Sequence, residues 1–181
     1  MKLKTFLIPL VLLIATVASA SHRTYSYPEY GFSAVFPIRT SVEKDASDPD
    51  VVTFTHDDGT AVLTVTVYGF DYAKALAKVP DVKTLLERLM NANVSSDVVM
   101  DPGGISWSKD EAGHLRATAS FVFTGTRKDG TTFRLHATHR LIAVPETQRF
   151  FELSFVISPA DEAGPSDTSP SDFFGNFKLL P

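Results

Sequence analysis

Three segments in which apolar side chains recur at every second position constrain the fold most strongly. They occupy residues 114–126, 131–144 and 149–158. Asp129-Gly130 separates the first two, and Pro145 opens the turn before the third. A period of two is typical of strands, and Asp-Gly is a frequent hairpin turn. The pattern therefore predicts a three-strand antiparallel meander with one apolar face and one more polar face.

Shorter segments extend the predicted sheet. Residues 51–56 and 61–68 are rich in β-branched side chains and flank Asp58-Gly59, which predicts a second hairpin. Residues 31–37 alternate and end at Pro37, and residues 21–30 and 105–108 are interpreted as further short strands. Residues 38–50 are polar and acidic and are interpreted as a solvated loop.

Two helices are predicted. Val82, Leu85, Leu86, Leu89 and Met90 form one apolar stripe at helical spacing, and Asp81 is positioned to cap that helix. Residues 169–172 match a capping box, and three phenylalanines follow them at helical spacing. The predicted fold class is therefore α+β: a twisted antiparallel sheet of about six strands packed with a central and a C-terminal helix.

The first twenty residues differ from the rest. Lys2 and Lys4 precede an apolar run over residues 6–17, and Ala18-Ser19-Ala20 follows it. This is the pattern of a signal peptide cleaved after Ala20, and the run is shorter than the ~20 residues of a membrane-spanning helix. It predicts a signal peptide over residues 1–20, a single domain over 21–181, and export to the periplasm or the extracellular space. An uncleaved N-terminal anchor is the alternative.

Composition excludes several functions. The chain has no cysteine, so thiol catalysis, disulfides and a lipid-anchored N-terminus are impossible. Its net charge of −4 argues against nucleic acid as a partner, because nucleic-acid binding needs basic surfaces. No cofactor is expected, and the scattered histidines predict no metal site. His136 and His139 lie three apart in one predicted strand, so they face opposite sides of the sheet.

The polar side of residues 131–144 is the candidate ligand-binding face. Arg134, His136 and Arg140 fall in phase there, and Glu152 is expected to pair with Arg140 from the neighbouring strand. Guanidinium groups bind carboxylates and phosphates bidentately, so this face is a candidate anion-binding surface. The alternative is an ordinary solvent-facing sheet. His139, in phase with apolar residues, is interpreted as a hydrogen-bonded core histidine.

No contiguous catalytic motif is present. The segment 104–108 lacks the second glycine of a nucleophile elbow, and 125–132 lacks the lysine of a phosphate-binding loop. No catalytic residue is therefore predicted. The expected function is a non-catalytic binding or accessory module whose partner is an envelope protein or a small ligand. The alternative is an anion-binding or hydrolytic domain that uses the face around Arg134, His136, Arg140 and Glu152.

Two short segments resemble a known family. The sequence GFSAVFP at residues 31–37 and FFGNFKLL at residues 173–180, with the order of elements between them, resemble the PsbP-like group over about residues 27–180. This group includes small exported bacterial proteins. The resemblance implies an α+β domain of a twisted antiparallel sheet packed with helices. Both segments are structural, so the resemblance assigns no functional residue and no photosystem role.

Overall fold

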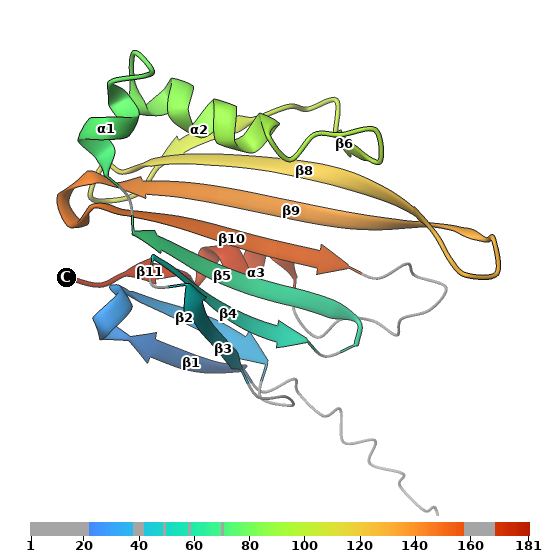
Figure 1. The fold of residues 1–181 in the computed structure, drawn as a ribbon. Helices are drawn as coiled ribbons and strands as arrows, with labels where there is room; N and C mark the ends of the chain where they lie inside the picture. Colours follow the sequence, from blue (N-terminus) through green and yellow to red (C-terminus); the bar gives the residue numbers. More distant parts are fainter. Residues whose placement is uncertain (1–21, 38–41, 49, 58, 70, 158–168) are drawn as a thin grey trace, which may run out of the picture.

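The computed structural model describes residues 22–37, 42–48, 50–57, 59–69, 71–157 and 169–181. These residues form an α+β structure with one eight-stranded and one three-stranded antiparallel sheet (Figure 1). The large sheet contains, in spatial order, β3 (Glu43–Asp48), β4 (Val51–Asp57), β5 (Ala61–Gly69), β10 (Arg149–Ile157), β9 (Thr132–Val144), β8 (Leu115–Thr126) and β6 (Val98–Met100). Its eighth strand, β7 (Ser106–Lys109), also pairs with β8.

The small sheet and the helices complete the fold. The small sheet has the order β1 (His22–Tyr27), β2 (Phe32–Pro37) and β11 (Lys178–Leu179). The α-helices are α1 (Tyr72–Leu76), α2 (Val82–Asn91) and α3 (Pro170–Gly175), and the 3-10 turns are η1 (Pro28–Tyr30) and η2 (Pro145–Thr147). The α+β class is confirmed, but the prediction of one sheet with about six strands is wrong. The described residues contain eleven strands, because the first segments form a separate sheet and several strands are very short.

The predicted meander and hairpin are confirmed. β8, β9 and β10 follow one another as antiparallel neighbours, and β4 pairs with β5. The interpretation of residues 38–50 as a loop is wrong for Glu43–Asp48, which form the edge strand β3. All six residues of β3 are exposed, so burial imposes no alternation on its sequence.

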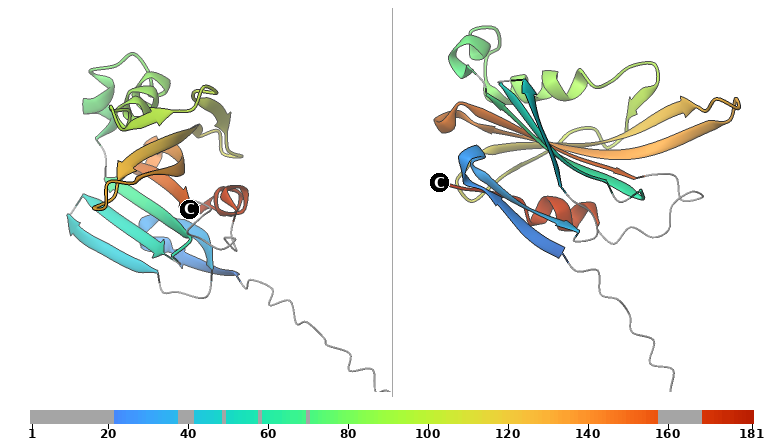
Figure 2. Two further views of the ribbon diagram at one scale, coloured as in Figure 1. Left: turned by 90° about the vertical axis from the view of Figure 1, so that its right-hand side faces the viewer. Right: turned by 60° about the horizontal axis from the view of Figure 1, so that its bottom comes forward.

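Other elements cover both faces of the large sheet (Figure 2), and an apolar core lies on each face. Leu86 and Met90 of α2 pack on one face against residues of β8 and β9, including Phe121 and Leu141. The opposite face packs against the small sheet and α3. This second core is aromatic and includes Phe32, Phe36, Phe54, Phe151, Phe155 and Phe173. Because neighbouring side chains of β10 point to opposite faces, Phe150 enters the first core and Phe151 the second.

Side chains cap both predicted helices as expected. The carboxylate of Asp81 accepts a hydrogen bond of 2.7 Å from the Thr84 amide at the start of α2. The hydroxyl of Ser169 accepts one of 3.1 Å from the Asp172 amide at the start of α3. None of the helices in the described part of the chain has the length and apolar character needed to cross a membrane.

Candidate functional site

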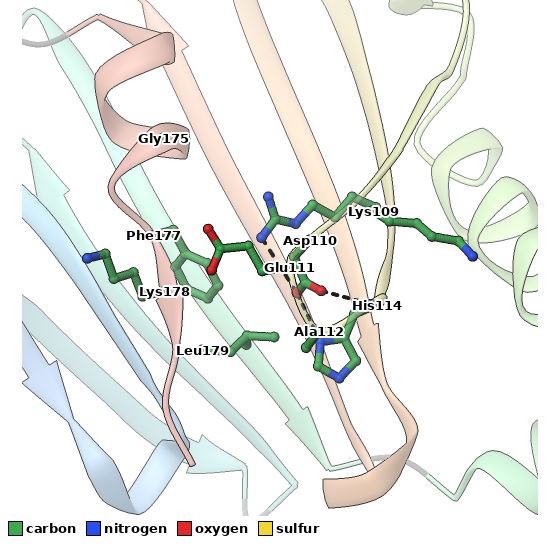
Figure 3. A pocket seen from close by; sticks show the side chains of 10 residues that line it. Lys109, Asp110, Glu111, Ala112, His114, Gly175, Phe177, Lys178 and Leu179 are labelled. Carbon is green, nitrogen blue, oxygen red and sulfur yellow. Dashed lines mark hydrogen bonds and ion pairs between the residues drawn. The ribbon is translucent and has the colours of Figure 1, made fainter.

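A pocket of about 500 Å³ lies where the turn between β7 and β8 meets α3 and β11 (Figure 3). Its polar wall comes from the β7–β8 turn and the start of β8. Its apolar wall comes from the C-terminal segment. The lining residues are Lys109, Asp110, Glu111, Ala112, His114, Arg116, Gly175, Phe177, Lys178 and Leu179.

The β7–β8 turn fixes the position of the Asp110 carboxylate at the pocket wall. The Gly113 amide donates to the Asp110 carbonyl, and Gly113 has φ of 91°, a conformation that favours glycine. One carboxylate oxygen of Asp110 accepts a hydrogen bond of 2.8 Å from the His114 amide. Asp110 is therefore held at the pocket wall by its own turn.

His114 and Arg116 surround the carboxylate of Asp110. His114 Nδ1 lies 2.9 Å from Asp110 Oδ2, and its Nε2 lies 3.2 Å from Glu146 Oε2. Arg116 Nη2 lies 3.6 Å from Asp110 Oδ2, which is a long ion pair. Burial raises the pKa of Asp110, but the hydrogen bonds from His114 and the charges of His114 and Arg116 outweigh it and lower that pKa below its ordinary value.

Not all hydrogen-bond donors of the Arg116 guanidinium group have a partner among the described residues. Its Nε is buried and has no hydrogen-bond partner among the described residues. A second guanidinium, that of Arg140, lies close enough for the charge of Arg116 to contribute, after burial, to a lowered pKa. Arg140 donates to Thr118 Oγ1 at 3.1 Å and to the Phe174 carbonyl at 3.0 Å, both of which are neutral acceptors. Two guanidinium groups thus lie near each other, and the carboxylate that pairs with Arg116, that of Asp110, is held mainly by His114.

The structure separates the four residues of the predicted ligand-binding face. Arg134, His136 and Arg140 share one face of β9, as predicted. Arg134 and His136 are exposed, however, whereas Arg140 is covered by α3. Glu152 lies on the other face of the sheet, directly opposite Leu141 in the pairing of β9 with β10.

The predicted pair of Arg140 with Glu152 is therefore wrong. The residue opposite Arg140 is Leu153, and Glu152 accepts hydrogen bonds from His139 Nδ1 at 3.0 Å and from the Tyr68 hydroxyl at 2.9 Å. The turn η2 sets this register, and a shift of one residue moves a side chain to the opposite face. The prediction of His139 as a hydrogen-bonded histidine on the apolar face is confirmed.

Sequence reasoning did not find the pocket residues. Asp110 and Arg116 lie on either side of the Gly113 turn, and their contact depends on how the chain reverses there. The signal that was available is the cluster of charged side chains over residues 109–116, interrupted by a glycine. Within the described residues, no group of three or more histidine, aspartate or glutamate side chains is placed to hold a metal ion.

Comparisons with known proteins give fold-level similarity alone. No protein-family model and no curated protein matches the chain. Similar solved structures include the Ran-binding protein Mog1p of Saccharomyces cerevisiae, with 9% sequence identity and a TM-score of 0.49 over 90% of this chain and 97% of that chain. A point mutant of Mog1 gives 9% identity and a TM-score of 0.48 over 88% of this chain and 96% of that chain. At this identity the similarity supports no inference about what the chain binds.

These findings correct two predictions. The assignment to the PsbP-like group is replaced by similarity to Mog1 structures. The predicted export to a periplasmic or extracellular location is corrected as well, because the similar solved structures are of a Ran-binding protein. Residues 1–21 lie outside the described residues, so cleavage after Ala20 stays a prediction.

Proposed function

We propose that the protein binds a small anionic ligand, a carboxylate or a phosphate, in the pocket beside Arg116, and that this pocket is a binding site and not a catalytic one. The observation that supports this most directly is the pair of neighbouring guanidinium groups, Arg116 and Arg140. Among the described residues they make one ion pair, the long contact of Arg116 with Asp110. A planar guanidinium binds carboxylate and phosphate oxygens through two parallel hydrogen bonds. An incoming anion would supply the negative charge that this part of the molecule lacks.

The charge of the pocket differs from that of the whole chain. The chain has a net charge of −4, whereas the pocket lining has three permanent cations, Lys109, Arg116 and Lys178, against two acids. Figure 3 places Lys109 and Lys178 on opposite sides of the pocket, with both ammonium groups directed away from its centre. In these positions the two lysines add to the positive potential around the pocket without lining its interior with their charges. A locally positive concavity on an acidic protein concentrates small anions.

The opposite wall limits the size and character of the ligand. Phe177 and Leu179 give the pocket an apolar side, and its volume of about 500 Å³ lies within the range of small-molecule sites. The ligand that fits best is therefore a small organic acid or phosphate ester with an apolar body. Its anionic group would face Arg116, and its body would lie against Phe177.

Calorimetric titration of the purified protein with benzoate and with phenyl phosphate tests this proposal. Arg116→Gln removes the guanidinium and is expected to weaken binding at least tenfold, which corresponds to about 1.4 kcal/mol. Arg134→Gln makes the same change in charge on the exposed part of β9 and is expected to change affinity less than twofold. Equal affinities for the two variants, or no binding of either probe to the unmodified protein, would contradict the proposal.

A further inference from the structure

Four side chains on the α2 side of the large sheet form one chain of hydrogen bonds. The Tyr68 hydroxyl donates to Glu152 at 2.9 Å, and the other carboxylate oxygen of Glu152 lies 3.0 Å from His139 Nδ1. His139 Nε2 in turn lies 3.4 Å from the hydroxyl oxygen of Ser154. We propose that Ser154 is a nucleophile activated by His139 and Glu152, and that this second site cleaves small carboxylic esters.

The connectivity is that of a serine, histidine and carboxylate triad. Hydrogen bonds from His139 and Tyr68 keep the pKa of Glu152 below its ordinary value despite burial, which alone raises it, so Glu152 is a carboxylate near neutral pH. A carboxylate only accepts, so His139 Nδ1 must hold the proton of that hydrogen bond. The Nε2 of a neutral His139 is then left to accept a proton from Ser154. Triads are recognised by such roles and geometry, since they occur on unrelated folds in different chain orders.

Strand pairing holds the three residues in place. Glu152 and Ser154 lie two apart in β10, so both side chains point to the same face. Ser154 is directly opposite His139 in β9, and the ring of Phe121 contacts the imidazole edge-to-face at 5.3 Å. A distance of 3.4 Å is long for a hydrogen bond, but contacts between nucleophile and base are often longer without substrate.

A pocket adjoins this triad. It has a volume of about 310 Å³ and shares Glu152 and Tyr68 with the hydrogen-bond chain. Its other lining residues are Gly69, Leu89, Ala92, Asn93, Leu141 and Phe150. The largely apolar wall suits a short aliphatic or aromatic acyl group. Ser154 is partly exposed, and Thr64, opposite it in β5, brings a hydroxyl donor to the same face for the developing oxyanion.

The reaction is balanced with water as the second reactant. The hydroxyl oxygen of Ser154 forms a bond to the ester carbonyl carbon, and its proton moves to His139 Nε2. The bond from that carbon to the alcohol oxygen breaks, and the proton passes from His139 to the departing alcohol. Water then attacks the acyl-serine with His139 as base, which releases the carboxylic acid and restores Ser154.

A fluorophosphonate probe tests the nucleophile directly. The full chain is incubated with the probe at pH 7.5, and the modified residue is located by peptide mass spectrometry. We expect a stable adduct on Ser154, and labelling at least tenfold slower in His139→Gln and Glu152→Gln. Thermal melting of each variant shows whether it remains folded. Hydrolysis of p-nitrophenyl butyrate by the same samples is expected to be lost in Ser154→Ala.

Ser120→Ala is the matched control, because Ser120 lies on the opposite face of the sheet and hydrogen-bonds Thr138. It is expected to leave both labelling and ester hydrolysis unchanged. The proposal is overturned if Ser154 acquires no adduct in the folded protein. Labelling of Ser154 at the same rate in a folded His139→Gln variant would also reject it. Anion binding at the Arg116 pocket is on the other side of the sheet, so either proposal can fail without the other.

Discussion

At the residue scale, Glu152 shows how its surroundings determine the state of one side chain. The carboxyl group is largely buried, and burial alone raises its pKa. Hydrogen bonds from His139 and Tyr68 outweigh burial and lower the pKa below 4.5, with a smaller contribution from the charge of His139 when its ring is protonated. The same carboxylate raises the pKa of Tyr68, with burial the larger cause. Near neutral pH the Glu152 carboxyl is therefore ionised and the Tyr68 hydroxyl is protonated, as the hydrogen bond between them requires.

The lowered pKa of Glu152 predicts a pH-dependent stability. A carboxyl group with a lower pKa in the folded state stabilises that state above its unfolded pKa, near 4.5. That contribution is lost as the pH falls through the lower folded value. Glu152→Gln is therefore expected to reduce the free energy of unfolding at pH 7, and this difference should shrink below pH 4.5. Urea titrations of both proteins from pH 7 to pH 3 measure it, and a difference that is constant with pH would contradict the expectation.

The residues of the two candidate sites were predictable only in part. Alternation correctly grouped Arg134, His136 and Arg140 on one face and placed His139 on the other. The predicted face of Glu152 was wrong, because pairing Glu152 with Arg140 required the register between two neighbouring strands, which alternation within one strand does not give. Register is set by the turn η2, where Gln148 adopts φ of 52°, and a residue other than glycine gives no warning of that conformation.

At the element scale, the helix α3 closes the aromatic core over β9 and β10. Phe173 and Phe174 are buried there, and the Phe174 carbonyl accepts a hydrogen bond from Arg140. The helix has only six residues, so it is too short to be stable alone and depends on its cap and on its packing. Its capping box was readable from sequence because the signal is local.

Loss of the Ser169 cap of α3 is expected to reduce the free energy of unfolding. Ser169→Ala removes the hydroxyl that accepts a hydrogen bond from the Asp172 amide. We expect the free energy of unfolding to fall by about 1 kcal/mol, measured by chemical denaturation. Ser108→Ala, at an exposed position of β7, is the control and should change it much less. Equal effects of the two substitutions would show that the cap contributes nothing.

At the scale of the whole molecule, Phe32 connects the two sheets. It is fully buried in β2, and its ring lies 5.1 Å from that of Phe54 in β4 and 6.1 Å from that of Phe151 in β10. It also stacks on Phe177 at 5.7 Å. The sequence predicted most of these strands but not a second sheet, because the pairing of strands far apart in the chain leaves no local pattern.

Truncating this side chain should weaken the whole fold. Phe32→Ala leaves a cavity between the two sheets, and we expect it to cost about 3–5 kcal/mol of unfolding free energy. Phe133→Ala is the control, because Phe133 lies in the projecting β8–β9 hairpin and is only partly buried (Figure 1). It should cost far less. Denaturant unfolding followed by far-ultraviolet circular dichroism compares the two, and a similar loss for both would contradict a central role for Phe32.

The exposed strand β3 has a consequence for how copies of the protein meet. It is the outermost strand at one edge of the large sheet, and Glu43, Asp45 and Asp48 give it negative charge. The unpaired amides and carbonyls of an uncharged edge strand can form hydrogen bonds with a strand of another molecule, and repeated pairing of this kind extends sheets into fibrils. The negatively charged β3 strands of two molecules repel each other, so we expect this edge of the sheet to resist aggregation by strand pairing even at high protein concentration.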